Sequence, residues 1–146
     1  MEPLKPKLNH KAIGEQSEAI ITAKLLEAGY SVLMPFGDNR RYDLVIEDAD
    51  GKFGRIRCKT GWLENDGDYI EFATASKYYH TRAGRTDHGR RDYRGQIDYF
   101  AVYCPETRKA YFVPIDHVGN NNALLRLEPT KNNQKKNVRW AEDYQL

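Results

Sequence analysis

The chain has 146 residues, of which 40% are hydrophobic and 30% are charged, and this composition is typical of a folded, water-soluble domain. No stretch approaches the roughly 18 consecutive apolar residues of a membrane-spanning helix, and residues 1–9 lack the apolar core of a signal peptide. We therefore expect a single cytoplasmic domain over residues 1–146 that makes no membrane contact. The only cysteines, Cys58 and Cys104, lack the close spacing of a zinc site, and we expect both to be reduced.

The first predicted element is a helix over residues 11–28. Asn9 can cap its N-terminus, because an asparagine side chain readily accepts a hydrogen bond from a free backbone N–H of the first turn. Gly29 can end it, because glycine adopts the left-handed conformation that commonly follows a helix. Its apolar positions are Ile13, Ile20, Ile21 and Leu25.

After the helix, turn-forming residues separate a series of strand-forming runs. Strands are predicted over residues 30–34, 42–47, 53–60, 68–75, 97–103 and 110–114. A hairpin turn at residues 48–51 joins the second run to the third, and a short helix is expected within residues 116–125. One helix followed by many strands indicates an α+β domain, with helices packed on a mostly antiparallel or mixed sheet.

The hairpin over residues 42–60 places polar side chains where they can act together. Because strand side chains alternate between faces, Asp43 and Lys59 lie on the same side near one end of the hairpin. Glu18, in the first turns of the helix, can flank the sheet and join them. Each residue also has an ordinary structural explanation, since Asp43 and Lys59 can be a surface cross-strand pair and Glu18 a partner of the helix dipole.

Together the three residues have the composition of a site for phosphodiester hydrolysis. Carboxylates can hold a hard divalent cation, which neutralises charge at the scissile phosphate and activates a water molecule. A lysine beside them can orient or deprotonate that water, or stabilise the developing negative charge.

Several sequence blocks resemble the PD-(D/E)XK nuclease superfamily. They are Gly14-Glu15-Gln16-Ser17-Glu18, Tyr42-Asp43-Leu44-Val45 and Ile56-Arg57-Cys58-Lys59-Thr60. The first block looks like the helix of archaeal Holliday-junction resolvases. The wider chain, including residues 93–100, 102–107 and 139–141, is more similar to cyanobacterial group I intron-encoded homing endonucleases of this fold. The resemblance implies a restriction-endonuclease-like core, a mixed β-sheet flanked by helices, with an inserted DNA-binding loop or hairpin.

By this resemblance, Glu18 and Asp43 would bind the metal ion, Mg²⁺ or Mn²⁺, and Lys59 would be the catalytic lysine. Two residues before the lysine the superfamily has an acid, or glutamine in some homing enzymes, whereas this chain has Arg57. Arginine cannot bind a cation. Three alternatives follow: one metal held by Glu18, Asp43 and a backbone carbonyl; weak activity; or a change that silences the site. A salt bridge from Arg57 to Asp43 is the ordinary structural explanation.

Residues 76–96 form a basic segment in a chain whose net charge is only +2. Two aspartates and six basic residues give the segment a charge of +4, the basic residues being Lys77, Arg82, Arg85, Arg90, Arg91 and Arg94. We expect a long loop or extended hairpin that contacts DNA, the alternative being a solvated mobile loop. His80 and His88 lie in this segment without further residues at metal-ligand spacing, so we expect no metal there.

The sequence hypothesis is a metal-dependent, site-specific endonuclease that cuts double-stranded DNA in intron homing. The alternatives are a structure-specific nuclease for branched DNA and an inactive DNA-binding module in which Arg57 has replaced the acid or glutamine. A chain this short has little surface with which to read a long target, so we expect a homodimer or homotetramer.

Overall fold

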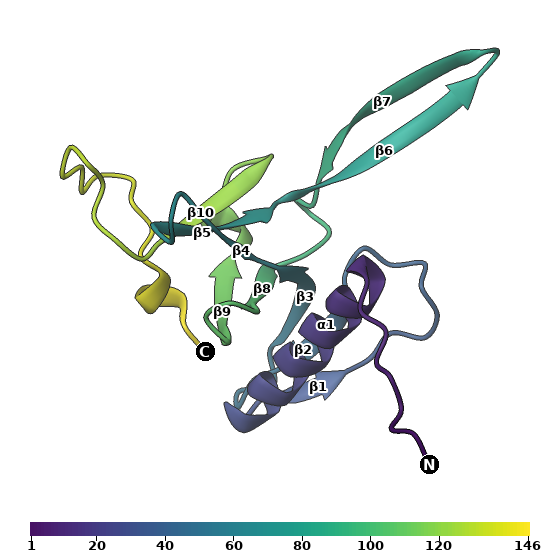
Figure 1. Cartoon of the computed structure of the whole chain (residues 1–146), viewed down its shortest axis with the longest axis horizontal. Coiled ribbons are helices and arrows are strands. Elements are labelled where there is room, and N and C mark those ends of the chain that lie inside the picture. Colours follow the sequence, from purple (N-terminus) through teal and green to yellow (C-terminus); the bar gives the residue numbers. More distant parts are fainter.

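The computed structural model describes all residues from 1 to 146 and contains one α-helix and ten strands (Figure 1). Helix α1 (His10–Glu27) begins after Asn9, whose side chain accepts a hydrogen bond of 2.9 Å from the backbone N–H of Ala12. It ends before Gly29, whose φ of +99° lies in the left-handed region that favours glycine. The predicted cap and stop are confirmed. No helix of the structure has the length and apolar character needed to cross a membrane.

The main sheet has the strand order β1-β2-β3-β8-β9. Its strands are β1 (Ser31–Leu33), β2 (Leu44–Glu47), β3 (Phe53–Thr60), β8 (Tyr99–Cys104) and β9 (Lys109–Pro114). Strands β3 and β8 are parallel, and every other neighbouring pair is antiparallel. The sheet is therefore mixed, as predicted, although α1 is the only α-helix that flanks it.

One face of the main sheet packs against α1. Ile21 and Leu25 of the helix are fully buried and form one cluster with Leu44, Ile46 and Ile56 of the sheet. These strand residues occupy alternate positions, so the period-2 pattern of the sequence gives β2 and β3 a continuous apolar face. The helix and the β2–β3 hairpin are thereby fixed relative to each other.

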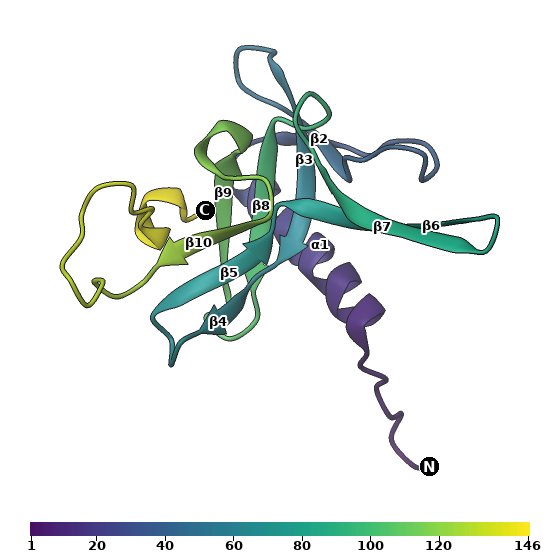
Figure 2. The same cartoon turned by 90° about the horizontal axis from the view of Figure 1, so that it is seen from above.

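The other face of the main sheet carries a second, three-stranded sheet with the order β10-β5-β4 (Figure 2). Its strands are β4 (Trp62–Glu64), β5 (Tyr69–Ala73) and β10 (Asn122–Arg126). Gly61, between β3 and β4, allows the two sheets to approach closely. A Cβ atom at this position would lie 2.7 Å from Cγ2 of Ile70 and 2.8 Å from Cγ1 of Val102.

The short helix expected within residues 116–125 is wrong. The structure has a 3₁₀ turn, η1 (Ile115–His117), followed by strand β10. Ala123 and Leu125 are buried whereas Leu124 between them is exposed, and all five residues of β10 pair with β5. Pairing with a strand that lies about 50 residues earlier in the chain decides this conformation, and no local signal announces it. A second 3₁₀ turn, η2 (Ala141–Tyr144), lies near the C-terminus.

The basic segment forms an extended hairpin of β6 (Ala75–Arg82) and β7 (Arg85–Asp92) that projects from the body of the molecule (Figures 1 and 2). Its tip is the two-residue turn Ala83-Gly84, where both φ angles are positive at +51° and +75°. Such a turn matches the twist of two antiparallel strands. Almost all hairpin residues beyond the base are exposed, so the hairpin belongs to neither core.

The packing of α1 predicts a contrast between two neighbouring leucines. Leu25→Ala should lower the free energy of unfolding by about 2–5 kcal/mol, because it empties a fully buried site. Leu26→Ala is the matched control and should change it by no more than about 0.5 kcal/mol, because Leu26 is 55% exposed. Urea unfolding followed by circular dichroism measures both values. Equal losses would mean that the helix buries a different face.

Candidate active site

Asp43 lies directly before β2 and is held in place by the neighbouring strand β3. Its backbone N–H donates a hydrogen bond of 2.8 Å to the carbonyl of Ile56. Its Oδ2 accepts one of 2.8 Å from the backbone N–H of Cys58. Its Oδ1 lies 3.2 Å from Nη1 of Arg57, and both side chains of this ion pair are largely buried. The carboxylate therefore has a fixed orientation and a cation in contact with one oxygen.

Arg57 also links the carboxylate to the preceding loop. The same Nη1 donates a hydrogen bond of 3.2 Å to the backbone carbonyl of Arg41, while the Nε of Arg57 is buried without a partner. The salt bridge to Asp43 that the sequence leaves as an alternative is thus present.

Glu18 of α1 approaches Asp43 from the side. The turn of helix that carries it is fixed by its neighbour Ser17, which is buried and whose Oγ lies 2.7 Å from Oγ1 of Thr60 at the end of β3. Burial raises the pKa of Glu18, and the negative charge of Asp43 raises it further, against a smaller opposing effect of Arg57. A carboxylate whose charged form is disfavoured by burial and by a neighbouring carboxylate is an arrangement that a divalent cation would relieve.

A cavity of about 340 Å³ brings these groups to solvent. Glu18, Asp43 and Arg57 line it together with the loop that precedes β2, including Asp38 and Arg40. No group of three histidine, cysteine, aspartate or glutamate side chains in the structure is arranged to hold a metal ion. The donor set is two carboxylates, which suffices for Mg²⁺ because this ion keeps several water ligands. The residues therefore fit one hard cation at Asp43 and Glu18, with Arg57 competing for Asp43.

Lys59 lies two residues beyond Arg57, on the same side of β3. Burial lowers the pKa of Lys59, and the positive charge of Arg57 lowers it too, whereas Tyr93 and Asp43 act in the opposite direction. Its Nζ donates a hydrogen bond of 3.3 Å to the hydroxyl of Tyr93 and forms no ion pair with either carboxylate. The structure thus brings Glu18, Asp43 and Arg57 into one cavity and places Lys59 beside it, against Tyr93.

Tyr93 is a residue of this site that the sequence analysis did not select. It follows β7 directly and is only 1% exposed. Its ring centre lies 3.8 Å from Cζ of Arg41, 4.9 Å from Nζ of Lys59 and 5.5 Å from Cζ of Arg57. Burial acts to raise the pKa of Tyr93, but the charges of Lys59, Arg57 and Arg41 and the hydrogen bond from Lys59 together lower that pKa. In the sequence, Tyr93 stood out only as part of the block at residues 93–100 that resembles homing endonucleases, and that resemblance assigned it no role.

Arg41 is the second residue that the sequence analysis did not select. Besides stacking on Tyr93, its guanidinium donates hydrogen bonds to both strands at the base of the hairpin. The acceptors are Oγ of Ser76 at 2.7 Å, the carbonyl of Arg91 at 3.0 Å and the carbonyl of Asp92. Nη1 also donates to Oε1 of Gln96 at 2.6 Å.

The six basic residues predicted to contact DNA are all exposed, but they do not form one group. Lys77, Arg82, Arg85, Arg90 and Arg91 lie on the hairpin. Arg94 lies beyond β7 and is tied to another loop, since it donates to the carbonyl of Val118 at 2.7 Å and to Oδ1 of Asn120 at 3.1 Å. The hairpin therefore carries five of the six, with Lys77 and Arg90 on one face and Arg82, Arg85 and Arg91 on the other.

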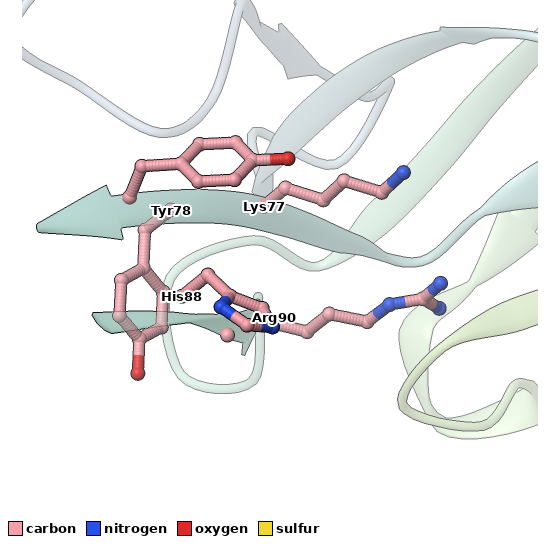
Figure 3. A pocket seen from close by; sticks show the side chains of 6 residues that line it. Lys77, Tyr78, His88 and Arg90 are labelled. Carbon is pink, nitrogen blue, oxygen red and sulfur yellow. The ribbon is translucent and has the colours of Figure 1, made fainter. Parts of the chain in front are cut away.

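The pairing of the hairpin strands assigns side chains to its two faces. Lys77 pairs with Arg90, and Tyr79 pairs and stacks with His88, so one face is lined by two cations and two rings. In Figure 3 the side chains of Lys77 and Arg90 extend in the same direction along the ribbon. Tyr78 covers Gly89 of the opposite strand, where a Cβ atom would lie 2.6 Å from the tyrosine hydroxyl.

The sequence profile of the PD-(D/E)XK endonuclease family matches residues 8–146. The chain belongs to this family. Its fold is similar to that of a bacterial homing endonuclease, I-Ssp6803I, with a TM-score of 0.72 and 22% sequence identity over 94% of this chain and 89% of that chain. No curated protein matches the chain. The resemblance stated from the sequence, and the restriction-endonuclease-like fold, are confirmed.

Membership of the PD-(D/E)XK family gives the geometry a chemical meaning. These endonucleases generally use divalent metal ions, and the paired carboxylates of Glu18 and Asp43 are suited to hold one. Arg57 places a positive charge next to one of these two carboxylates.

Proposed function

We propose that this PD-(D/E)XK endonuclease cuts double-stranded DNA at a specific site with Mg²⁺ or Mn²⁺, and that it acts in intron homing. The observation that carries the proposal is the shared cavity of Glu18 and Asp43 beside the partly buried Lys59. Site specificity and homing are supported by the likeness of the fold to I-Ssp6803I and by the long basic hairpin.

Glu18, Asp43 and Lys59 would have different roles in hydrolysis. Glu18 and Asp43 would hold the cation, which supplies positive charge at the scissile phosphate and favours ionisation of the attacking water. Lys59, whose pKa is lowered by burial, is more readily neutral than an exposed lysine and can take a proton from that water. In its charged form it can instead donate a hydrogen bond to a phosphate oxygen.

Arg57 gives Asp43 a partner when no metal ion is bound. Their ion pair is largely buried, and an unpaired carboxylate there would be costly. A metal ion must therefore compete with Arg57 for Asp43, or bind while Arg57 retains one oxygen. The same contact favours a second candidate function, a DNA-binding module without cleavage.

We further propose that the protein acts as a homodimer or homotetramer. One copy offers a single hairpin for recognition, and symmetric assembly multiplies the number of base pairs that are read. Sedimentation at several protein concentrations, with and without DNA, tests this part of the proposal.

The proposed reaction can be tested without assuming a target sequence. Duplexes bound by the protein are selected from a randomised library, and the selected site is placed in a supercoiled plasmid. Linearisation at that site with Mg²⁺ supports the proposal. Cutting restricted to four-way junctions indicates a structure-specific nuclease, and a mobility shift without cutting under any divalent ion indicates the binding module.

Loss of Asp43 or Lys59 should separate cleavage from binding. Asp43→Ala and Lys59→Ala should each reduce cleavage by at least ~100-fold and leave the Kd for the selected site nearly unchanged, because both act on the phosphate chemistry. Asp50→Ala and Lys52→Ala are the matched controls, because both residues are exposed and lie in the turn of the β2–β3 hairpin, at the end away from the site. Wild-type cutting rates in the first pair would refute the assignment.

Replacement of Arg57 should reveal whether it blocks the site. Arg57→Gln should raise the cleavage rate and lower the Mg²⁺ concentration needed for half-maximal cutting, because a neutral acceptor replaces a competing cation. Arg55→Gln is the control, since Arg55 lies on the same strand but pairs with Asp98. A fall in activity would instead indicate that Arg57 contacts the phosphate, and no change would show that it has neither role.

The hairpin should carry most of the salt-dependent affinity for DNA. Replacement of Lys77, Arg82, Arg85 and Arg90 by glutamine should weaken binding and flatten the dependence of log K on log salt by about 0.9 per lost phosphate contact. These side chains are exposed, so the fold should persist, which circular dichroism would verify. The control replaces Lys131, Lys135 and Lys136 of the C-terminal region. A larger effect in the control would move recognition to that region.

A further inference from the structure

Tyr93 connects the hairpin to the catalytic lysine. It is the first residue after β7, yet its side chain points into the protein and is buried. Its hydroxyl, at 3.3 Å, is the only hydrogen-bond partner of the Lys59 Nζ. A lysine side chain has many rotamers, so a single buried partner has a large share in deciding where the ammonium group lies.

Arg41 connects the same tyrosine to both strands of the hairpin. Its guanidinium covers the ring of Tyr93 at 3.8 Å and donates hydrogen bonds to Ser76 of β6 and to the backbone of Arg91 and Asp92 of β7. These contacts span 35 to 51 residues of sequence and are the side-chain hydrogen bonds that attach the base of the hairpin to the loop before β2.

The loop that carries Arg41 leads directly to the carboxylate. Arg41 precedes Asp43 by two residues, and its backbone carbonyl accepts a hydrogen bond from Arg57, the ion-pair partner of Asp43. The base of the hairpin thus reaches the site by two routes, through Tyr93 to Lys59 and through Arg41 to the Arg57–Asp43 pair.

We propose that Tyr93 is a positioning residue that holds Lys59 for cleavage, and that Arg41 locks Tyr93 to the base of the DNA-binding hairpin. Docking of the hairpin on DNA and placement of Lys59 are then coupled through one buried ring. This inference rests on the proposed nuclease function. Neither residue touches the DNA in it, so both act on the cleavage step rather than on affinity.

The charges around the ring support this arrangement. The charged groups near the ring of Tyr93 are the cations of Arg41, Arg57 and Lys59, and its hydroxyl has no hydrogen bond with a carboxylate. Cations are attracted to the face of an aromatic ring, and a buried ring strengthens that attraction because little water competes. A tyrosine can therefore hold three cations close together where an aliphatic residue could not.

The first experiment compares two buried tyrosines. Tyr93→Phe keeps the ring under Arg41 and removes only the hydroxyl, and should reduce the single-turnover cleavage rate at saturating DNA by about 10- to 100-fold, the effect of a misplaced catalytic group. The Kd should stay within about twofold, well below the tenfold step that corresponds to a significant lost contact. Tyr111→Phe is the control, because Tyr111 is also 1% exposed but its hydroxyl faces Thr107. Equal cleavage by Tyr93→Phe and wild type would overturn the inference.

The second experiment tests whether Arg41 and Tyr93 act together. Arg41→Gln removes the stacked guanidinium, and the double variant with Tyr93→Phe should lose little more cleavage than the more impaired single variant. Additive losses would overturn the proposed coupling. Urea unfolding of each variant shows whether it is folded, and Arg41→Gln on its own should already cut slowly if Tyr93→Phe does not fold.

The third measurement needs neither DNA nor metal ion. The ultraviolet absorbance of tyrosinate, compared between wild type and Tyr93→Phe across pH, isolates the ionisation of Tyr93. Lys59→Met should move that ionisation to higher pH, because the cation that lowers the pKa of Tyr93 is removed. An unmoved titration would show that the two groups are not in contact.

The outcomes distinguish this inference from the proposed function. A wild-type protein that cuts no DNA refutes the nuclease function, while the absorbance titration still reports on the contact of Tyr93 with Lys59. Active wild type with unimpaired Tyr93→Phe refutes the positioning role and leaves the nuclease function standing.

Discussion

The arrangement of the site depends on β3, the strand that pairs with β2 on one edge and with β8 on the other. Its Ile56 turns toward α1, whereas its Arg57 and Lys59 lie on the opposite side, near the ring of Tyr93 at the base of the β6–β7 hairpin. Antiparallel pairing with β2 brings Asp43 next to Arg57, and the Ser17–Thr60 hydrogen bond holds the turn with Glu18 at the end of β3. Polar groups of α1, of the residue before β2 and of β3 itself therefore meet, because β3 contacts both of the other elements.

Charge balance is the second constraint on this site. Two carboxylates, Glu18 and Asp43, face three cations, Arg41, Arg57 and Lys59, in a partly buried space. Desolvation makes every unpaired charge costly, so Asp43 pairs with Arg57 and the ring of Tyr93 accommodates the cations. A bound divalent cation would change this balance, because Asp43 would then have two positive partners. Replacement of Arg57 is for that reason the most direct test of whether Asp43 is free to hold a metal ion.

The β6–β7 hairpin is stabilised differently from the core. Its outer part buries almost nothing and keeps its form through strand pairing and the two-residue turn at its tip. Its base, in contrast, is fixed by the guanidinium of Arg41 and by the burial of Tyr93. The hairpin thus combines an exposed outer part with a base that is fixed to the body of the protein.

The sequence alone determined the local elements and much of the site. The cap at Asn9, the stop at Gly29 and the alternation of β2 and β3 are set by neighbouring residues, so α1 and the β2–β3 hairpin could be predicted. Alternation also put Asp43 and Lys59 on one side of that hairpin. The place of Glu18 in the first turns of the helix made it a candidate to join them, and family resemblance gave it the role of a metal ligand.

Tertiary structure alone decided the rest, because the deciding contacts join distant parts of the chain. Strand β10 forms only because β5 offers it a pairing edge. Arg57 forms a salt bridge because the fold brings both Asp43 and the backbone carbonyl of Arg41 within hydrogen-bond distance of its guanidinium. Tyr93 and Arg41 meet across 52 positions of sequence, and neither has a local pattern that reports its burial or its partners. Short-range periodicity carries no information about contacts that exist only once the two sheets, the helix and the hairpin base have come together.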